Sequence, residues 1–194
     1  MANVTGLLLA GGSGSRMGKP KALVRRGDGT PWLATARRAL LDGGCSDVLT
    51  VLGARADDAR ALIPDAWTVS AANWHEGMSA SLAAGLRELR PSSYHAAMIH
   101  LVDLPDVGAS VVARLLPYGT PSALARVTYG GDPGHPVVIG RDHWEHLLGT
   151  LGGDAGARDY LAARDVTLVE CADLAAGYDV DSADNHPGGP MLET

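Results

Sequence analysis

The chain has 194 residues, of which 46% are apolar and 20% are charged, with a formal net charge of −6 at pH 7. This length is typical of one domain with a full hydrophobic core, and the composition excludes a chain that is disordered throughout. The acidic balance excludes sequence-independent binding of nucleic acid, which requires the neutralisation of many phosphates.

Nothing in the sequence indicates a membrane or secretory segment. The N-terminal apolar run, residues 6–10, is too short for a signal peptide or a membrane span. The two cysteines, Cys45 and Cys171, lie far apart and imply no disulfide framework. We therefore expect a soluble protein of the reducing cytoplasm, with neither nucleic acid nor a membrane as a partner.

Predicted strands and helices alternate along the chain. Apolar runs and helical spacing predict, in chain order, a strand at 4–9, a helix at 30–41, a strand at 48–52, a helix at 57–62, a strand at 67–70, a helix at 78–89, a strand at 96–102, a helix at 107–116, strands at 123–129 and 136–139, helices at 142–148 and 156–163, and a strand at 166–169.

This order predicts a single-domain, three-layer α/β sandwich with a mostly parallel, Rossmann-like sheet. Residues 129–135 are expected to form a small antiparallel excursion on that sheet, with the glycine-rich stretch 130–134 as its connection. We expect the domain to span residues 1–184. Residues 185–194, in which His186 is followed by Pro-Gly-Gly-Pro, are expected to form a flexible tail.

Two polar residues are predicted at helix starts. Thr30 is expected to cap the helix that Pro31 opens, because proline is favoured at the first helical position. Asp106 is expected to cap the helix at 107–116, which leaves Asp103 available for a ligand.

A glycine-rich, basic segment follows the first strand, with the sequence LAGGSGSRMGKPK from Leu9 to Lys21. Glycines let backbone N–H groups approach phosphate oxygens, and ligands of open α/β sheets bind beyond the carboxyl ends of strands. A Walker A loop would have Gly in place of Ser13 and Ser or Thr in place of Pro20, and a dinucleotide fingerprint would have Gly in place of Met17. The segment therefore predicts a different, longer loop that holds a triphosphate.

The lysines of the chain gather in this loop. Lys19 and Lys21 are the only two, whereas arginine occurs 14 times. Because lysine and arginine are not equivalent around phosphates, two lysines kept beside a glycine cluster favour a functional role.

The loop resembles the signature of nucleotidyltransferases that share a fold with sugar-nucleotide pyrophosphorylases, with a departure at Ser13, where that family often has glycine. The resemblance implies a sheet of the nucleotidyltransferase type and catalytic roles for Lys21 and Arg16. It also implies a nucleotide-binding set made of Leu9, Ala10, Gly11, Gly12, Ser13, Gly14, Ser15, Arg16 and Lys21.

Two sets of carboxylates are candidate metal ligands: one follows the strand at 96–102, and the other lies near the C-terminus. Asp103 ends the strand and faces the ligand crevice, where Mg²⁺ would need only a few protein carboxylates beside phosphate and water. The resemblance implies a second metal ligand at Asp181, and whether Asp179 also binds stays open. The residues after Asp181, 182–185, depart from the family's Thr-Pro-Glu-Asp, and a pair of surface acids is the alternative interpretation.

Three later segments, 73–82, 130–137 and 153–158, resemble the molybdenum cofactor cytidylyltransferase family of MobA/MocA-like NTP transferases. The resemblance implies that Asn73, Gly77, Met78 and Ser79 bind the nucleotide. It implies that Ser81, His135 and Arg158 bind the acceptor. In the alternative interpretation Ser79 and Ser81 cap the helix at 78–89, and His135 is a turn residue.

The resemblance implies a Mg²⁺-dependent transfer of a nucleoside monophosphate, with CTP as the expected donor and a molybdopterin-type acceptor, and with release of pyrophosphate. A molybdoenzyme or its maturation chaperone would then be a partner. A guanylyltransferase or sugar-phosphate nucleotidyltransferase is the first alternative, and a non-catalytic carrier of a nucleotide or cofactor is the second. The residues do not distinguish CTP from GTP.

Overall fold

The computed structural model describes residues 3–14 and 17–179, so the predicted tail at 185–194 lies outside the described residues. Within them, seven strands form one sheet in the order β3-β2-β1-β4-β6-β5-β7. The strands are β1 (Val4–Ala10), β2 (Val48–Leu52), β3 (Thr68–Ser70), β4 (Ala96–Leu101), β5 (Leu124–Tyr129), β6 (Asp132–Gly140) and β7 (Thr167–Glu170).

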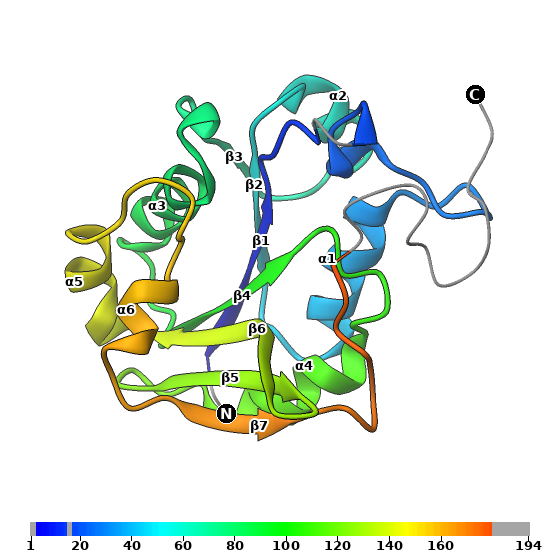
Figure 1. Cartoon of the computed structure of the whole chain (residues 1–194). Coiled ribbons are helices and arrows are strands. Elements are labelled where there is room, and N and C mark those ends of the chain that lie inside the picture. Colours follow the sequence, from blue (N-terminus) through cyan, green and yellow to red (C-terminus); the bar gives the residue numbers. More distant parts are fainter. Residues whose placement is uncertain (1–2, 15–16, 180–194) are drawn as a thin grey trace.

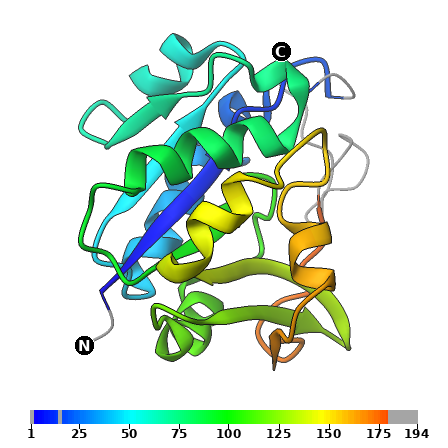
Figure 2. The ribbon, with the colours of Figure 1, turned by 90° about the vertical axis from the view of Figure 1, so that its left-hand side faces the viewer.

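Helices cover both faces of the sheet, as Figure 1 shows. Helices α1 (Trp32–Asp42) and α4 (Ala109–Leu115) pack on one face, and α3 (Met78–Leu89), α5 (Trp144–Leu148) and α6 (Arg158–Ala162) lie over the other (Figures 1 and 2). The remaining elements are α2 (Ala56–Ala61) and the 3-10 turns Lys21–Leu23, Trp74–Glu76, Leu116–Tyr118 and Arg141–His143. The predicted three-layer α/β sandwich is confirmed. No helix of the described residues is long and apolar enough to cross a membrane.

Close packing fixes α3 on the sheet. Gly85 faces the side chains of Leu7 and Val51, and a Cβ atom at Gly85 would lie 2.5 Å from Leu7 and 2.9 Å from Val51. The strands β1, β2 and β4 are buried along their whole length, as expected for parallel strands that are covered on both faces. The start of α3 is thereby held at the end of the central strands.

The strand order creates a crevice at one edge of the sheet. Strand β1 pairs in parallel with β2 on one side and with β4 on the other, so the carboxyl ends of all three strands meet there. The chain leaves β1 towards β2 and later returns to β4. In open α/β sheets such a switch point between neighbouring strands is where ligands bind.

The antiparallel part of the sheet differs from the prediction. Strand β6 begins at Asp132, and its connection to β5 is only the two-residue turn Gly130-Gly131, with φ values of 63° and 91°. Residues 132–134 were expected in the connection, and the second strand was expected to begin only at Pro136. They pair with β5 alone, since the pairing of β6 with β4 begins only at Val137, and proline is tolerated where a strand has a single neighbour.

Both predicted helix caps are wrong. Helix α1 begins at Trp32 after Pro31, without a side-chain cap, because the Thr30 carbonyl accepts the Arg26 amide at 2.8 Å in a small bridge that precedes the helix. Helix α4 begins after Gly108, also without a side-chain cap, and Asp106 binds a segment near the C-terminus instead.

Candidate nucleotide-binding pocket

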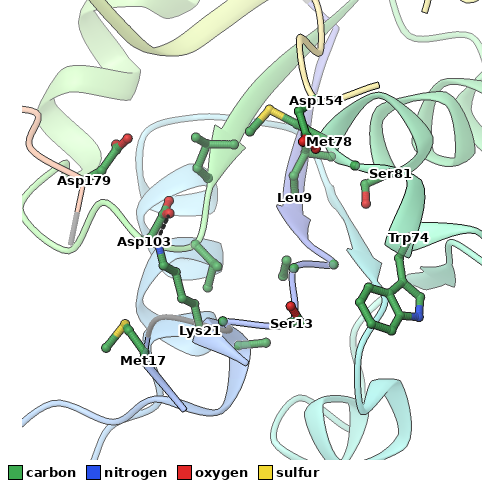
Figure 3. Close-up of a pocket in the computed structure, with 18 of the residues that line it drawn as sticks. Leu9, Ser13, Met17, Lys21, Trp74, Met78, Ser81, Asp103, Asp154 and Asp179 are labelled. Atoms are coloured by element: carbon green, nitrogen blue, oxygen red, sulfur yellow. Dashed lines mark hydrogen bonds and ion pairs between the residues drawn. The ribbon is translucent and has the colours of Figure 1, made fainter. Parts of the chain in front are cut away.

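A pocket of about 620 Å³ opens at the carboxyl ends of β1 and β4 (Figure 3). It joins the loop after β1, the end of β4, the start of α3 and two segments from the last third of the chain. Its lining residues are Leu9, Ala10, Gly11, Gly12, Ser13, Gly14, Met17, Lys21, Ala22, Trp74, His75, Gly77, Met78, Ser81, Leu101, Val102, Asp103, Asp154 and Asp179.

Glycines shape the loop after β1. The Gly11 carbonyl accepts the Ala54 amide at 3.1 Å, and a Cβ atom at Gly11 would lie 2.5 Å from Ser81 Oγ. Gly14 has a φ of 63° and lies against the Lys19 carbonyl, so a side chain there would be strained and would collide. Gly12 has open space where a Cβ atom would be. The loop is therefore anchored at both ends and leaves its middle open to the pocket.

Lys21 and Asp103 form an ion pair at one side of the pocket, and Figure 3 shows Trp74 and Ser81 at the other. Lys21 Nζ lies 2.7 Å from Asp103 Oδ2, and the two side chains are only 18% and 17% exposed. Lys21 begins the 3-10 turn that follows the loop, and Asp103 directly follows Val102 at the end of β4. The fold thus joins a cation and a carboxylate that are 82 residues apart in sequence.

The second oxygen of Asp103 fits a divalent cation. Asp103 Oδ1 is buried and has no hydrogen-bond partner among the described residues, which is costly unless another positive group binds there. Asp179 lines the same pocket. No group of three or more His, Cys, Asp or Glu side chains that could hold a metal occurs among the described residues. A cation at Asp103 would therefore need phosphate and water oxygens, a combination that is typical of Mg²⁺.

The segments at 73–82 and 153–158 pack against each other. Ser79 Oγ donates to the Gly152 carbonyl at 3.0 Å and accepts the Gly156 amide at 3.1 Å, while the Ser79 amide donates to the Gly153 carbonyl at 3.2 Å. Gly77, with a φ of 112°, lies against the Asp154 carboxylate, where a Cβ atom would collide. The capping interpretation of Ser79 is therefore wrong, because α3 has no side-chain cap.

Eleven of the predicted site residues line this pocket. They are Leu9, Ala10, Gly11, Gly12, Ser13, Gly14, Lys21, Gly77, Met78, Ser81 and Asp103. Three more, Ser15, Arg16 and Asp181, lie outside the described residues.

The other four predicted site residues do not line the pocket. Asn73 Nδ2 donates to Glu76 at 2.7 Å. Ser79 lies in the first turn of α3, where its side chain is buried. Arg158 is exposed, with its nearest acidic partner, Asp159, at 3.7 Å. His135 is half-buried on β6, where desolvation and then the nearby charge of Arg126 lower its pKa to about 4. His135 is therefore uncharged at neutral pH.

Several pocket residues were not predicted as site residues. Trp74 and His75 form one wall, with their rings edge to face at 6.0 Å, and Met17 and Asp154 lie at other points of the lining. Trp74, His75 and Asp154 belong to the two later segments that carry the family resemblance. Trp74 packs closely against Gly53, and Asp154 packs closely against Gly77. These contacts place both side chains at the pocket, and they cannot be predicted from the sequence.

A glycine-rich loop, a partly buried lysine and a carboxylate at the switch point of an α/β sheet are the features of a nucleotide-binding site. The MobA-like NTP transferase domain matches residues 6–168. The chain belongs to this family and is a nucleotidyltransferase-type enzyme, which implies a nucleoside triphosphate as substrate.

Known proteins of similar sequence and structure span nearly the whole chain. Nicotine blue oxidoreductase of Paenarthrobacter nicotinovorans is 35% identical over 193 residues, which cover 93% of each protein. Rv0371c of Mycobacterium tuberculosis H37Rv aligns with a TM-score of 0.77 and 25% identity over 94% of this chain and 95% of its own. A structure of Rv0371c in complex with manganese aligns with a TM-score of 0.72 and 22% identity over 88% and 89% of the two chains.

A nucleotidyl transferase of Methanothermobacter thermautotrophicus shares the fold. It aligns with a TM-score of 0.79 and 19% identity over 94% of this chain and 93% of its own. The nucleotidyltransferase fold predicted from the loop and the strand order is therefore confirmed.

Proposed function

We propose that this enzyme transfers a nucleoside monophosphate from CTP to a phosphorylated acceptor of the molybdopterin type and releases pyrophosphate. The observation that carries the proposal is the ion pair of Lys21 and Asp103 beside the glycine-rich loop. The second, buried oxygen of Asp103 has no hydrogen-bond partner within the part of the chain that the structure describes. A triphosphate bound there would meet a cation, exposed loop residues and a carboxylate that can hold Mg²⁺.

The proposed chemistry is an in-line attack by the acceptor phosphate on the α-phosphorus of the nucleotide. A new P–O bond forms to the acceptor as the bond to the leaving pyrophosphate breaks. The attacking phosphate is already ionised at neutral pH, so no general base is needed, and catalysis consists of positioning and charge neutralisation. Lys21, joined by Arg16, would offset the charge that develops on pyrophosphate, and residues 11–15 would bind the outer phosphates.

Asp103 is the proposed protein ligand for Mg²⁺, together with Asp181 or Asp179. When bound, Mg²⁺ would neutralise phosphate charge and orient the entering and leaving oxygens. The manganese complex of Rv0371c, which shares this fold, supports the use of a divalent cation by this enzyme. Bound nucleotide is expected to tighten the binding of the metal, because few protein carboxylates meet there and phosphate oxygens would complete its coordination.

The opposite wall of the pocket is the proposed site of the base and the acceptor. Trp74 offers an aromatic face on which a nucleobase or a pterin ring can stack. Ser81 lies against Gly11, close to where the phosphates would bind. His135, uncharged at neutral pH, would contribute a hydrogen bond to the acceptor and not a positive charge. Arg158 would reach an acceptor that extends beyond the pocket, and a molybdoenzyme or its maturation chaperone would receive the product.

An oxidoreductase is the second candidate, because the 35% identical relative is named nicotine blue oxidoreductase. Such an activity would transfer electrons from a reduced donor to a dye-like acceptor and would release no pyrophosphate. It would not depend on Lys21 or on the unpaired oxygen of Asp103. The retained ion pair of these residues therefore favours nucleotidyl transfer.

The two functions can be separated with the purified protein. Pyrophosphate release is measured with CTP and with GTP, with and without molybdopterin, in Mg²⁺ and in a chelator. In parallel, reduction of nicotine blue is measured with NADH and NADPH. We expect pyrophosphate only with CTP, acceptor and Mg²⁺ together, and its loss in Asp103→Asn. Dye reduction that is unchanged in Asp103→Asn, without pyrophosphate release, would replace the proposal with the second candidate. Release of pyrophosphate with GTP and acceptor, but not with CTP and acceptor, would identify a guanylyltransferase.

A further inference from the structure

Two carboxylates on the turn after β4 serve different parts of the molecule. Asp103 lines the pocket, whereas Asp106 turns to the segment near the C-terminus, residues 171–179. Asp106 Oδ2 accepts the amides of Ala176 and Gly177, both at 2.9 Å. One short turn therefore holds a pocket carboxylate and an anchor for a segment that lies 70 residues further along the chain.

The anchored segment ends at a pocket residue. Asp179 lies two residues after Gly177, lines the pocket and is seen near Asp103 in Figure 3. Two successive amides bound to one carboxylate oxygen fix the path of the backbone immediately before Asp179. Through this anchor the position of Asp179 is tied to that of the turn that carries Asp103.

A second contact makes the placement of Gly177 specific. Gly177 has a φ of 69° and lies against the ring of Tyr129, where a Cβ atom would collide. The same ring edge lies against Gly134, and Tyr129 Oη donates to the His135 carbonyl at 2.8 Å. Tyr129 thus lies between β6 and the anchored segment, so the segment cannot shift towards the sheet.

The start of the segment is held independently of Asp106. Arg114 of α4 donates to both oxygens of Asp173 and to the Glu170 carbonyl, the latter at 3.0 Å. Loss of Asp106 would therefore release the backbone at residues 176 and 177 while leaving the beginning of the segment attached.

We propose that Asp106 is a positioning residue that holds Asp179 opposite Asp103 and thereby sets the affinity of the pocket for a divalent cation. This inference rests on the proposed function, because it assigns the cation of that reaction to the two carboxylates. Asp106 itself contacts neither the nucleotide nor the metal. It acts through the backbone, as outer residues that orient metal ligands do.

The test measures the binding of Mn²⁺ alone to the full chain by isothermal titration, and hydrogen exchange at the amides of residues 176 and 177. Asp106→Ala is expected to weaken Mn²⁺ binding by about 10-fold and to speed exchange at both amides. Asp106→Asn keeps one oxygen that can accept both amides, so it should restore most of the affinity. Asp42→Ala, which removes an exposed ion pair with Arg38 on α1, is the matched control and should behave as the parent.

A double variant tests the route of the effect. If Asp106 acts through Asp179, then Asp106→Ala combined with Asp179→Ala should bind Mn²⁺ no more weakly than Asp179→Ala alone. Additive losses, parental Mn²⁺ binding in Asp106→Ala, or unchanged exchange at residues 176 and 177 would each overturn the inference. If Asp106→Ala does not fold, Asp106→Ser, whose shorter side chain does not reach both amides, takes its place in both comparisons. A parent that binds Mn²⁺ in this pattern but releases no pyrophosphate would refute the proposed function and leave the positioning role intact.

Discussion

The parallel and antiparallel parts of the sheet contribute differently to the pocket. Strands β1, β2 and β4 are buried, regular and parallel, and they deliver the glycine-rich loop, Lys21 and Asp103 to one edge. The part from β5 to the C-terminal segment delivers Asp154 and Asp179, and its loops are held by hydrogen bonds from side chains to distant backbone groups. Strand pairing therefore places Lys21 and Asp103, and polar anchors place the loops that carry Asp154 and Asp179.

The largest effect is expected in the parallel part. Lys21→Ala should lower the turnover of pyrophosphate release by roughly 100- to 1000-fold, because a positioned charge at the developing pyrophosphate is lost. The fold should be retained, as measured by circular dichroism and the melting temperature. Lys19→Ala, in the same loop but exposed, is the matched control and should cost much less. Equal losses in the two variants would mean that only the net charge of the loop matters.

A smaller effect is expected where the two late segments are joined. Ser79→Ala removes the hydroxyl that links the Gly152 carbonyl and the Gly156 amide, and it leaves buried groups unpaired. The free energy of unfolding should fall by about 2 kcal/mol, as measured by urea denaturation. The KM for the acceptor should also rise, since Asp154 lies in the same loop. Ser110→Ala on the exposed face of α4 should change neither quantity, and a parental KM in Ser79→Ala would separate this loop from substrate binding.

The difference between the parallel and antiparallel parts also explains which elements could be predicted from the sequence and which could not. The central strands and α3 were predicted within one residue of their observed ends, because β1 and β4 are continuous apolar runs and α3 has apolar residues at helical spacing. The start of β6 was missed, because prolines usually exclude a strand and their tolerance depends on which neighbours β6 has. Local capping rules failed at Thr30 and Asp106, because both residues take partners outside the helix that follows them.

The pocket residues also divide into those that the sequence predicted and those that it missed. Lys21 and Asp103 were singled out from motifs that lie beside strand ends, where the parallel topology brings them together. Asp154 and Trp74 were missed as pocket residues, because their position depends on close approach to Gly77 and Gly53 from other elements. Arg158 and His135 carry the family resemblance in sequence, yet neither lines the pocket. Their proposed acceptor role therefore requires an acceptor that reaches beyond the pocket.

The smallest effect is expected at Glu170, which braces the antiparallel part. Its carboxylate accepts the amides of Ala172, Gly130, Gly131 and Cys171 and the hydroxyl of Thr128. The bonds from Ala172 and Gly130, followed by those from Thr128 and Gly131, lower its pKa from about 4.5 to about 2. Because the pKa is lower in the folded chain, the stabilisation is fully present above pH 4.5 and is lost as the pH falls towards 2.

Glu170→Gln should therefore lower the melting temperature by a few degrees at pH 7, and the gap to the parent should narrow between pH 4.5 and 2. Glu145→Gln, which removes an exposed ion pair with Arg90, is the matched control and should melt close to the parent at pH 7. A gap for Glu170→Gln that is constant down to pH 2 would show that the charge of this carboxylate does not brace the turn.

The central claim is that the pocket at the ends of β1 and β4 catalyses nucleotidyl transfer. It is tested most directly by following two labels in CTP, one on the α-phosphorus and one on the γ-phosphorus, with molybdopterin and Mg²⁺ present. The account predicts that the α-label moves to the acceptor and the γ-label leaves as pyrophosphate, and that both are slower by roughly 100- to 1000-fold in Lys21→Ala. An α-label that stays in CTP under all conditions, or a γ-label that moves to the acceptor, would contradict it.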